Sequence, residues 1–179
     1  MVREIGLGGL TIERITKRGK MARSTVYELF DNRASVVRFA LSLGNEKLRT
    51  AVDDAASAPG DANIRMERVI AALLAAAEAE PALTTLCLVQ GGAALEPPAA
   101  TLDPELLAAL AKGLLTDRSP GYPAPVPCVD ELLACGVLSV IADRLRQGEE
   151  ERLWELGPEL VEIIALAGGA PRSESSPRS

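Results

Sequence analysis

Apolar residues recur three and four positions apart along most of this 179-residue chain, and this spacing decides the fold class. One run places Val37, Leu41, Gly44, Leu48 and Val52 at intervals of four, three, four and four. This pattern puts the apolar side chains on one face of an α-helix. Ala and Leu make up much of the hydrophobic content, whereas strand-forming and aromatic residues are scarce. We therefore expect an all-α protein.

Capping residues and breaks divide the chain into helices. Thr11 suits the N-cap of a first helix that ends at Gly19, and Asn32 suits the N-cap of a long helix that runs to about residue 57. Between them, residues 22–29 form a second short helix. Its inward-facing residues are expected to be Val26, Leu29 and Phe30.

Beyond residue 60, the same spacing predicts further helices at residues 64–79, 83–89, 103–115, 129–146 and 159–166. Four prolines fall within residues 119–127, which we expect to form an extended loop. The composition of residues 168–179 is typical of a disordered tail.

Charge is distributed unevenly along the chain. Residues 1–50 hold ten Lys and Arg against five Asp and Glu, a net charge of +5, whereas the remaining residues carry −11 and the whole chain −6. Such asymmetry is typical of a nucleic-acid-binding head on an acidic body; the alternative is chance variation of charge over segments this short. We expect a DNA-binding domain at 1–50, a helical ligand-binding and dimerisation domain at 51–167 and the tail at 168–179, with the long helix joining head to body.

The residue types argue against an enzyme and against a metal site. The chain has no histidine, so no Ser–His or Cys–His arrangement is possible. Cys87, Cys128 and Cys135 are widely spaced and form no CxxC pair. We expect no metal and no cofactor. Since neither a signal-peptide pattern nor an apolar run of about 20 residues is found, we expect a soluble, cytoplasmic protein without a membrane partner.

The first two short helices, with the long helix behind them, match a helix-turn-helix arrangement. The second helix of such a unit can lie in the major groove of DNA. Its outward residues are then expected to contact DNA: Arg23, Ser24, Thr25, Tyr27 and Glu28. Arg33, at the start of the long helix, can reach the DNA backbone beside the N-terminal amides of that helix.

The stretch LTIERITKRGKMARSTVYELFDNRASVV resembles the helix-turn-helix signature of the TetR family of bacterial transcriptional regulators. That signature is a helix started by Thr, a turn, a Thr-hydrophobic-Tyr-x-x-Phe core and a basic residue three positions beyond the Phe. The residues in register are Thr11, Ile15, Thr25, Val26, Tyr27, Phe30, Arg33 and Val36. The match covers about thirty residues. The order of helices after it is also similar to that of the family, down to the last two.

The resemblance implies roles for individual residues. Tyr27 and Arg33 would contact phosphates, Thr25 with Arg23 and Ser24 would face the groove, and Thr11 would approach the DNA backbone. We add Lys20 and Glu28 as candidate contacts. A purely structural role in the small core is the alternative for Tyr27 and Phe30, and for Phe30 we favour it.

The chain departs from the family pattern at three places. Lys20 stands where a turn residue usually is glycine, so a positive φ is expected there. Ala22 replaces the usual capping Ser, so the second helix should lack its side-chain cap. Residues 1–9 are too few for the helix of about four turns that normally comes first, and we expect that helix to be incomplete.

For the body, the resemblance implies a pocket for a small, mostly apolar effector and a homodimer formed by the last two helices. Candidate pocket residues are Met66, Cys87, Gln90 and Trp154, with ordinary core packing as the alternative for each. The dimer would use residues 129–142 and 159–166. The expected partners are a double-stranded DNA operator, the effector and a second copy. The expected function is transcriptional regulation, usually repression; the alternative is a dimerisation or ligand-sequestering protein with a defective DNA-binding head.

Overall fold

The structure, a computed structural model, describes residues 11–20, 22–91, 102–115 and 128–168, and these form helices and connections without any strand. The predicted all-α class is therefore confirmed. Three expectations lie outside the described residues: the incomplete first helix at residues 1–9, the proline-rich loop at 119–127 and the tail from residue 169. In chain order the elements are α2 (Ile12–Gly19), α3 (Arg23–Leu29), α4 (Arg33–Ser57), α5 (Ala62–Ala79), α6 (Pro81–Thr85), the π-helix η1 (Leu86–Gln90), α7 (Pro104–Leu115), α8 (Val129–Gln147), the 3₁₀-helix η3 (Glu150–Leu156) and α9 (Gly157–Gly168).

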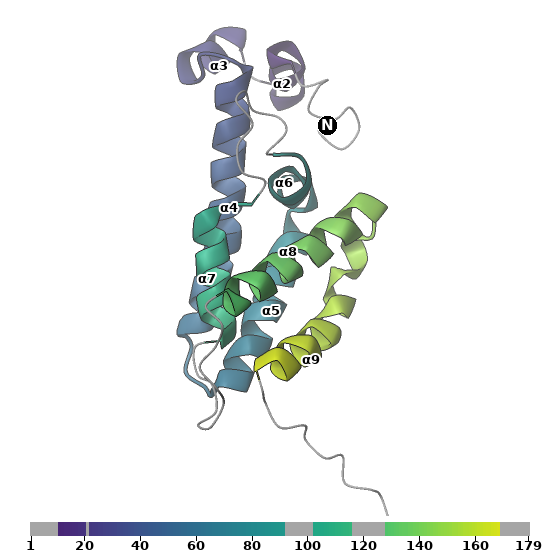
Figure 1. The fold of residues 1–179 in the computed structure, drawn as a ribbon. Helices are drawn as coiled ribbons and strands as arrows, with labels where there is room; N and C mark the ends of the chain where they lie inside the picture. Colours follow the sequence, from purple (N-terminus) through teal and green to yellow (C-terminus); the bar gives the residue numbers. More distant parts are fainter. Residues whose placement is uncertain (1–10, 21, 92–101, 116–127, 169–179) are drawn as a thin grey trace, which may run out of the picture.

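The long helix α4 runs from one end of the molecule into the body (Figure 1). Helices α2 and α3 lie at its N-terminal end and contact each other. The remainder of α4 packs against α5, α6, η1 and α7. Helix α8 contacts α7 and η1, while η3 and α9 pack on the side of α5 opposite α4 (Figure 1). The molecule is thus a small head on a rod that is embedded in a helical body.

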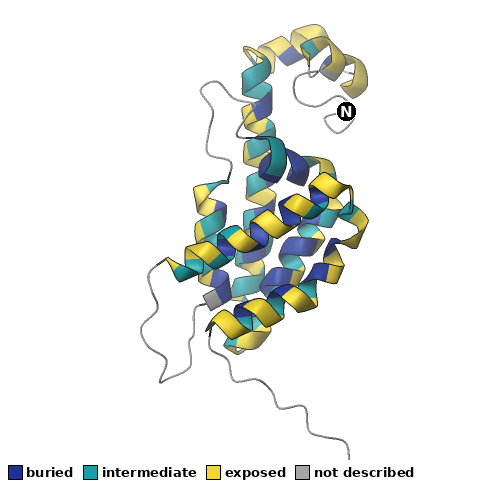
Figure 2. Ribbon diagram, turned by 45° about the vertical axis from the view of Figure 1, so that its right-hand side comes forward, coloured by how far each residue is buried: buried dark blue, intermediate teal, exposed yellow. Residues whose placement is uncertain are grey.

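One continuous hydrophobic core lies in the body (Figure 2). Helix α5 supplies its centre, because the six side chains predicted to face inward are all buried: Met66, Val69, Ile70, Leu73, Leu74 and Ala77. Leu48 and Val52 of α4 are also buried, and both belong to this core. The head, in contrast, is mostly exposed (Figure 2). Nearly all the apolar burial that stabilises the fold therefore lies in the body.

Local capping fixes several helix ends where the sequence predicts them. The Thr11 hydroxyl accepts a hydrogen bond from the backbone N–H of Arg14 at 3.2 Å and so starts α2. Asn32 starts α4 through a capping box with Ser35, in which each side chain accepts from the backbone N–H of the other. Gly148 ends α8 in the left-handed region, with φ 79°. These ends depend only on neighbouring residues, which is why the sequence locates them.

One expectation about local structure is wrong, and another is right in position but not in helix type. Leu29 does not face inward, since 64% of its surface is exposed. Helix α3 is only seven residues long, and the described part of the head buries only one of its side chains, that of Val26. The helix expected at residues 83–89 is present, but it begins at Pro81 as α6 and continues from Leu86 to Gln90 as the π-helix η1. Besides these differences, η3 is an element that the apolar spacing does not predict.

No single helix in the described ranges is long and apolar enough to cross a membrane. Helix α5 taken together with the segment Pro81–Gln90 meets the length and composition requirement, across a bend of 102°.

Candidate nucleic-acid interface and ligand pocket

The outward face of α3 carries the five residues that the sequence nominates for DNA contact. Arg23, Ser24, Thr25, Tyr27 and Glu28 are all exposed, and Tyr27 has 49% of its surface accessible. The guanidinium of Arg23 lies 5.9 Å from the centre of the Tyr27 ring, within the range of a cation–π interaction. These side chains form one polar, aromatic surface at the tip of the molecule.

A few apolar side chains on the inner face of α3 and just after it attach this helix to the rest of the molecule. Val26 is buried to 1% exposure, whereas Phe30, which follows the helix, is half-buried. The Phe30 ring lies 5.5 Å from the Phe39 ring of α4, at an angle of 59° between the ring planes. Such tilted ring pairs are favourable. Phe30 therefore has a structural role, while the exposure of Tyr27 removes it from the core.

The turn between α2 and α3 has both local features that the sequence predicts. Lys20 adopts a left-handed conformation with φ 50° and ψ 35°, and its N–H hydrogen-bonds the carbonyl of Thr16. Ala22 takes an extended conformation at the N-cap of α3, and no side chain caps that helix. The turn is thus built without the glycine and the hydroxyl that would best suit these two positions.

The remaining candidates lie around this surface. Thr11 and Lys20 are exposed at the two ends of α2, and Arg33 is half-buried at the first turn of α4. Three exposed basic residues of α2 were not nominated, although the local excess of Lys and Arg already pointed to them: Arg14, Lys17 and Arg18. With Lys20 and Arg23, they make the described head strongly basic.

The structure does not gather the four candidate pocket residues into one cavity. Met66 is buried in the core, and Gln90 is half-buried at the end of η1. Cys87 is buried where η1 meets α4; its thiol lies 3.6 Å from the Leu41 carbonyl, to which it donates. Burial raises the pKa of the Cys87 thiol to about 12, with a smaller contribution from the negative charge of Asp103. Such a thiol is not reactive near neutral pH.

Trp154 alone among the four lines a described cavity. A groove of about 580 Å³ runs between α5 on one side and η3 with the start of α9 on the other. Its lining is mostly apolar, and its carboxylates are Glu67 and Glu78 of α5. Trp154 is 63% exposed, and its backbone N–H donates to Oε1 of Glu78 at 2.7 Å. The spacing of apolar residues could not identify these two glutamates as groove residues. The groove exists only because a second wall, formed by residues about 80 positions later, packs opposite them.

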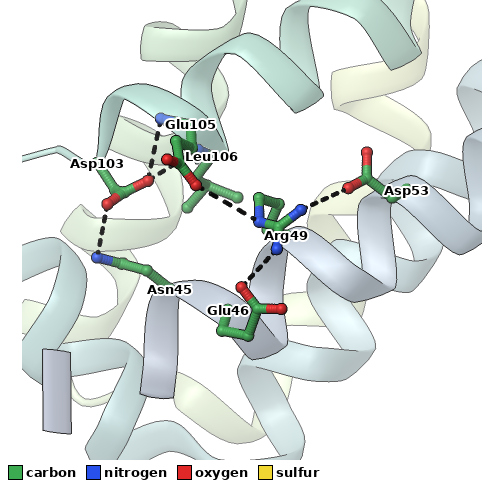
Figure 3. A network of polar contacts seen from close by, with 7 residues as sticks. All are labelled: Asn45, Glu46, Arg49, Asp53, Asp103, Glu105 and Leu106. Atoms are coloured by element: carbon green, nitrogen blue, oxygen red, sulfur yellow. Dashed lines mark hydrogen bonds and ion pairs between the residues drawn. The ribbon is translucent and has the colours of Figure 1, made fainter. Parts of the chain in front are cut away.

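A polar network links α4 to the beginning of α7 (Figure 3). Asn45 donates to Oδ2 of Asp103 at 3.3 Å, and Oδ1 of Asp103 caps α7 by accepting from the backbone N–H of Glu105 and of Leu106. Arg49 forms ion pairs with Glu46 and Asp53 of its own helix and, at 4.0 Å, with Glu105. Together with the apolar contacts of α4 and α7, this network makes α4 part of the body.

The outer faces of α8 and α9 leave apolar side chains uncovered. Leu132 is 64% exposed and Val140 38% exposed on α8, while Ile163 and Leu166 of α9 are each 49% exposed. Gly136 lies between the two exposed residues of α8, and a Cβ at this position would have open space around it. Surfaces of this kind are commonly buried by association. They fall within the two segments that the sequence nominates for a dimer.

Comparison of the chain with protein-family models, with curated proteins and with solved structures gave no match in any of the three.

Proposed function

We propose that this protein is a DNA-binding transcriptional regulator of the TetR type. It would act in the cytoplasm as a homodimeric repressor, released from DNA by a small, mostly apolar effector. The observation that carries the proposal is the exposed face of α3. Arg23, Ser24, Thr25 and Tyr27 point away from the molecule on a helix that Val26 anchors. Arg, Ser, Thr and Tyr are residue types that contact phosphates and base edges.

A homodimer would present two such helices to one DNA site. Two heads must match half-sites about 34–36 Å apart, or a multiple of this spacing. An effector that favours one arrangement of the body changes the distance between the heads and hence the affinity for the operator. The packing of α4 against α5, η1 and α7 offers a route by which the body can act on the head.

The test is fluorescence anisotropy of the protein with the DNA upstream of its own gene, measured at two salt concentrations against random-sequence competitor. The proposal predicts salt-sensitive binding that outcompetes random DNA. Equal binding to both DNAs, or no binding, would contradict it.

Dimerisation is tested separately by sedimentation equilibrium. Ile163→Glu places a charge on the uncovered face of α9 and should shift the protein from dimer to monomer. Ile64→Glu is the matched control, since Ile64 is also about half exposed but lies on α5, outside the proposed interface. A protein that is monomeric before any substitution would remove the dimer from the proposal.

The second candidate is a dimerisation or ligand-sequestering protein whose head does not bind DNA. The thin packing of the head favours it: Leu29 and Phe39 are 64% and 58% exposed, and α3 has no side-chain cap. A stable dimer that fails to bind any DNA would select this candidate over the regulator.

A further inference from the structure

The groove between α5 and the η3–α9 segment has a regular construction. Helix α5 contributes a single stripe of residues to it, namely Glu67, Ile70, Ala71, Leu74, Ala75 and Glu78. Glu67 and Glu78 are eleven residues apart, which is close to three helical turns and about 16 Å along the axis. The two carboxylates therefore lie on the same face of α5, one at each end of an apolar floor.

The opposite wall is apolar and includes one aromatic ring. It consists of Trp154, Gly157, Pro158 and Val161. The backbone hydrogen bond from Trp154 to Glu78 ties this wall to α5, and because it engages Oε1 it leaves Oε2 of Glu78 for another partner. An exposed tryptophan beside carboxylates provides two of the attractions that bind an organic cation, namely charge and the face of the indole ring.

The negative charges of Glu67 and Glu78 are not neutralised by other residues that line the groove. None of the described lining residues is basic. Arg152, two positions before Trp154, is engaged by Glu155 through two hydrogen bonds of 2.9 and 2.7 Å. The volume of about 580 Å³ lies within the range of small-molecule sites. An anion would be repelled by both carboxylates, and a neutral chain would gain nothing from their charge.

We propose that this groove binds an elongated organic dication, with its apolar chain on the floor of α5 and one ammonium group at each glutamate. The site is separate from the proposed dimer face, since Ile163 and Leu166 are exposed and do not line the groove. Binding here does not require the protein to bind DNA. The two proposals can therefore fail independently.

The experiment uses a ten-carbon chain that carries different end groups. The probes are the bis(trimethylammonium) dication, the single-ended decyltrimethylammonium, the neutral decanediol and the decanedioate dianion. Trp154 is the only tryptophan of the chain, so its fluorescence reports binding directly, and calorimetry gives the affinity independently. We expect the dication to bind most tightly, the single-ended cation less tightly and the diol and dianion not measurably.

Charge removal provides the matched variants. Glu67→Gln should weaken binding of the dication about two- to fivefold, the range of an exposed ion pair, and should reduce its advantage over the single-ended cation. Asp54→Asn removes one negative charge from an exposed position of α4, outside both the groove and the proposed dimer segments, and should leave the affinity unchanged. Trp154→Phe, followed by calorimetry, should weaken both cations.

Two results would overturn the proposal. Equal affinity for the diol and the dication would mean that the groove selects apolar chains without regard to charge. An equal loss in Asp54→Asn and Glu67→Gln would mean that the cation is attracted only by the overall negative charge of the body. Circular dichroism on each variant confirms that it is folded before binding is compared.

Discussion

Lys20 has the only positive φ among the described residues other than glycine. A side chain in the left-handed region costs roughly 1–2 kcal/mol, because its Cβ crowds the backbone. The residue nevertheless carries a positive charge at the exposed end of α2, next to the surface proposed for DNA contact. The turn between α2 and α3 is therefore less stable with lysine at this position than it would be with glycine, but it carries a basic side chain.

This cost gives a prediction for Lys20→Gly. The substitution should raise the free energy of unfolding by about 1 kcal/mol, since glycine accepts this conformation without crowding. Lys20→Ala is the control, because it removes the same charge and keeps the Cβ. Urea denaturation measures both. An equal effect of the two substitutions would show that charge, and not backbone strain, sets the stability of the turn.

Cys87 gives a prediction for alkaline pH. Burial holds its pKa at about 12, against an ordinary value of 9.0, so the folded state keeps this proton while the unfolded state loses it. The unfolded state then binds fewer protons, and the contribution of Cys87 to the free energy of unfolding should fall as the pH rises from 9.0 towards 12. Denaturant unfolding over this range should show a steeper fall for the parent protein and Cys128→Ala than for Cys87→Ala. If the free energy of unfolding fell equally steeply with pH in all three proteins, the result would contradict this prediction.

The helices show how much of the fold can be predicted from the sequence. The ends of α2 and α4 and the whole apolar face of α5 follow from caps and spacing, which are local properties. The exposure of Leu29 and the π-helix η1 do not, because they depend on what packs against them. The same division applies to the sites: the exposed face of α3 is predicted, but the groove requires two walls that are distant in sequence.

Gly44 and Gly136 are both helical glycines, but their surroundings differ. A Cβ at Gly44 of α4 would lie 2.4 Å from Sγ of Cys87 and 2.9 Å from Cγ of Leu83, whereas none of the described residues approaches a Cβ at Gly136 within 4 Å. Close approach of α4 to α6 and η1 thus depends on the missing side chain at Gly44. At Gly136 of α8, no neighbouring element within one copy of the chain comes close enough to need a glycine.

We therefore predict opposite effects of the same substitution. Gly44→Ala should lower the free energy of unfolding by about 1–3 kcal/mol through overpacking. Gly136→Ala should raise it by up to about 1 kcal/mol, since alanine favours helix and has room. Thermal or urea unfolding at a protein concentration where both are monomeric gives the comparison. A destabilised Gly136→Ala would contradict the open surroundings of this residue.

The separation of charge between head and body concerns the molecule as a whole. If the basic head holds DNA, Arg23→Ala should weaken binding to all sequences and lower the slope of log affinity against log salt by about one. Arg146→Ala removes the same charge from an exposed position near the end of α8 and should leave the slope unchanged. Anisotropy titrations at several salt concentrations measure both. An unchanged slope in Arg23→Ala would exclude this residue from phosphate contacts.

Helix α4 has a mechanical consequence. Its 25 residues span about 37 Å, with the head at the N-terminal end and the C-terminal half packed in the body. If the whole helix turned by about 5° about its C-terminal end, its N-terminal end would move by roughly 3 Å, which is comparable to the rise of one base pair, about 3.4 Å. If the head holds DNA as proposed, so small a rotation of α4 would shift it by about one step along the duplex.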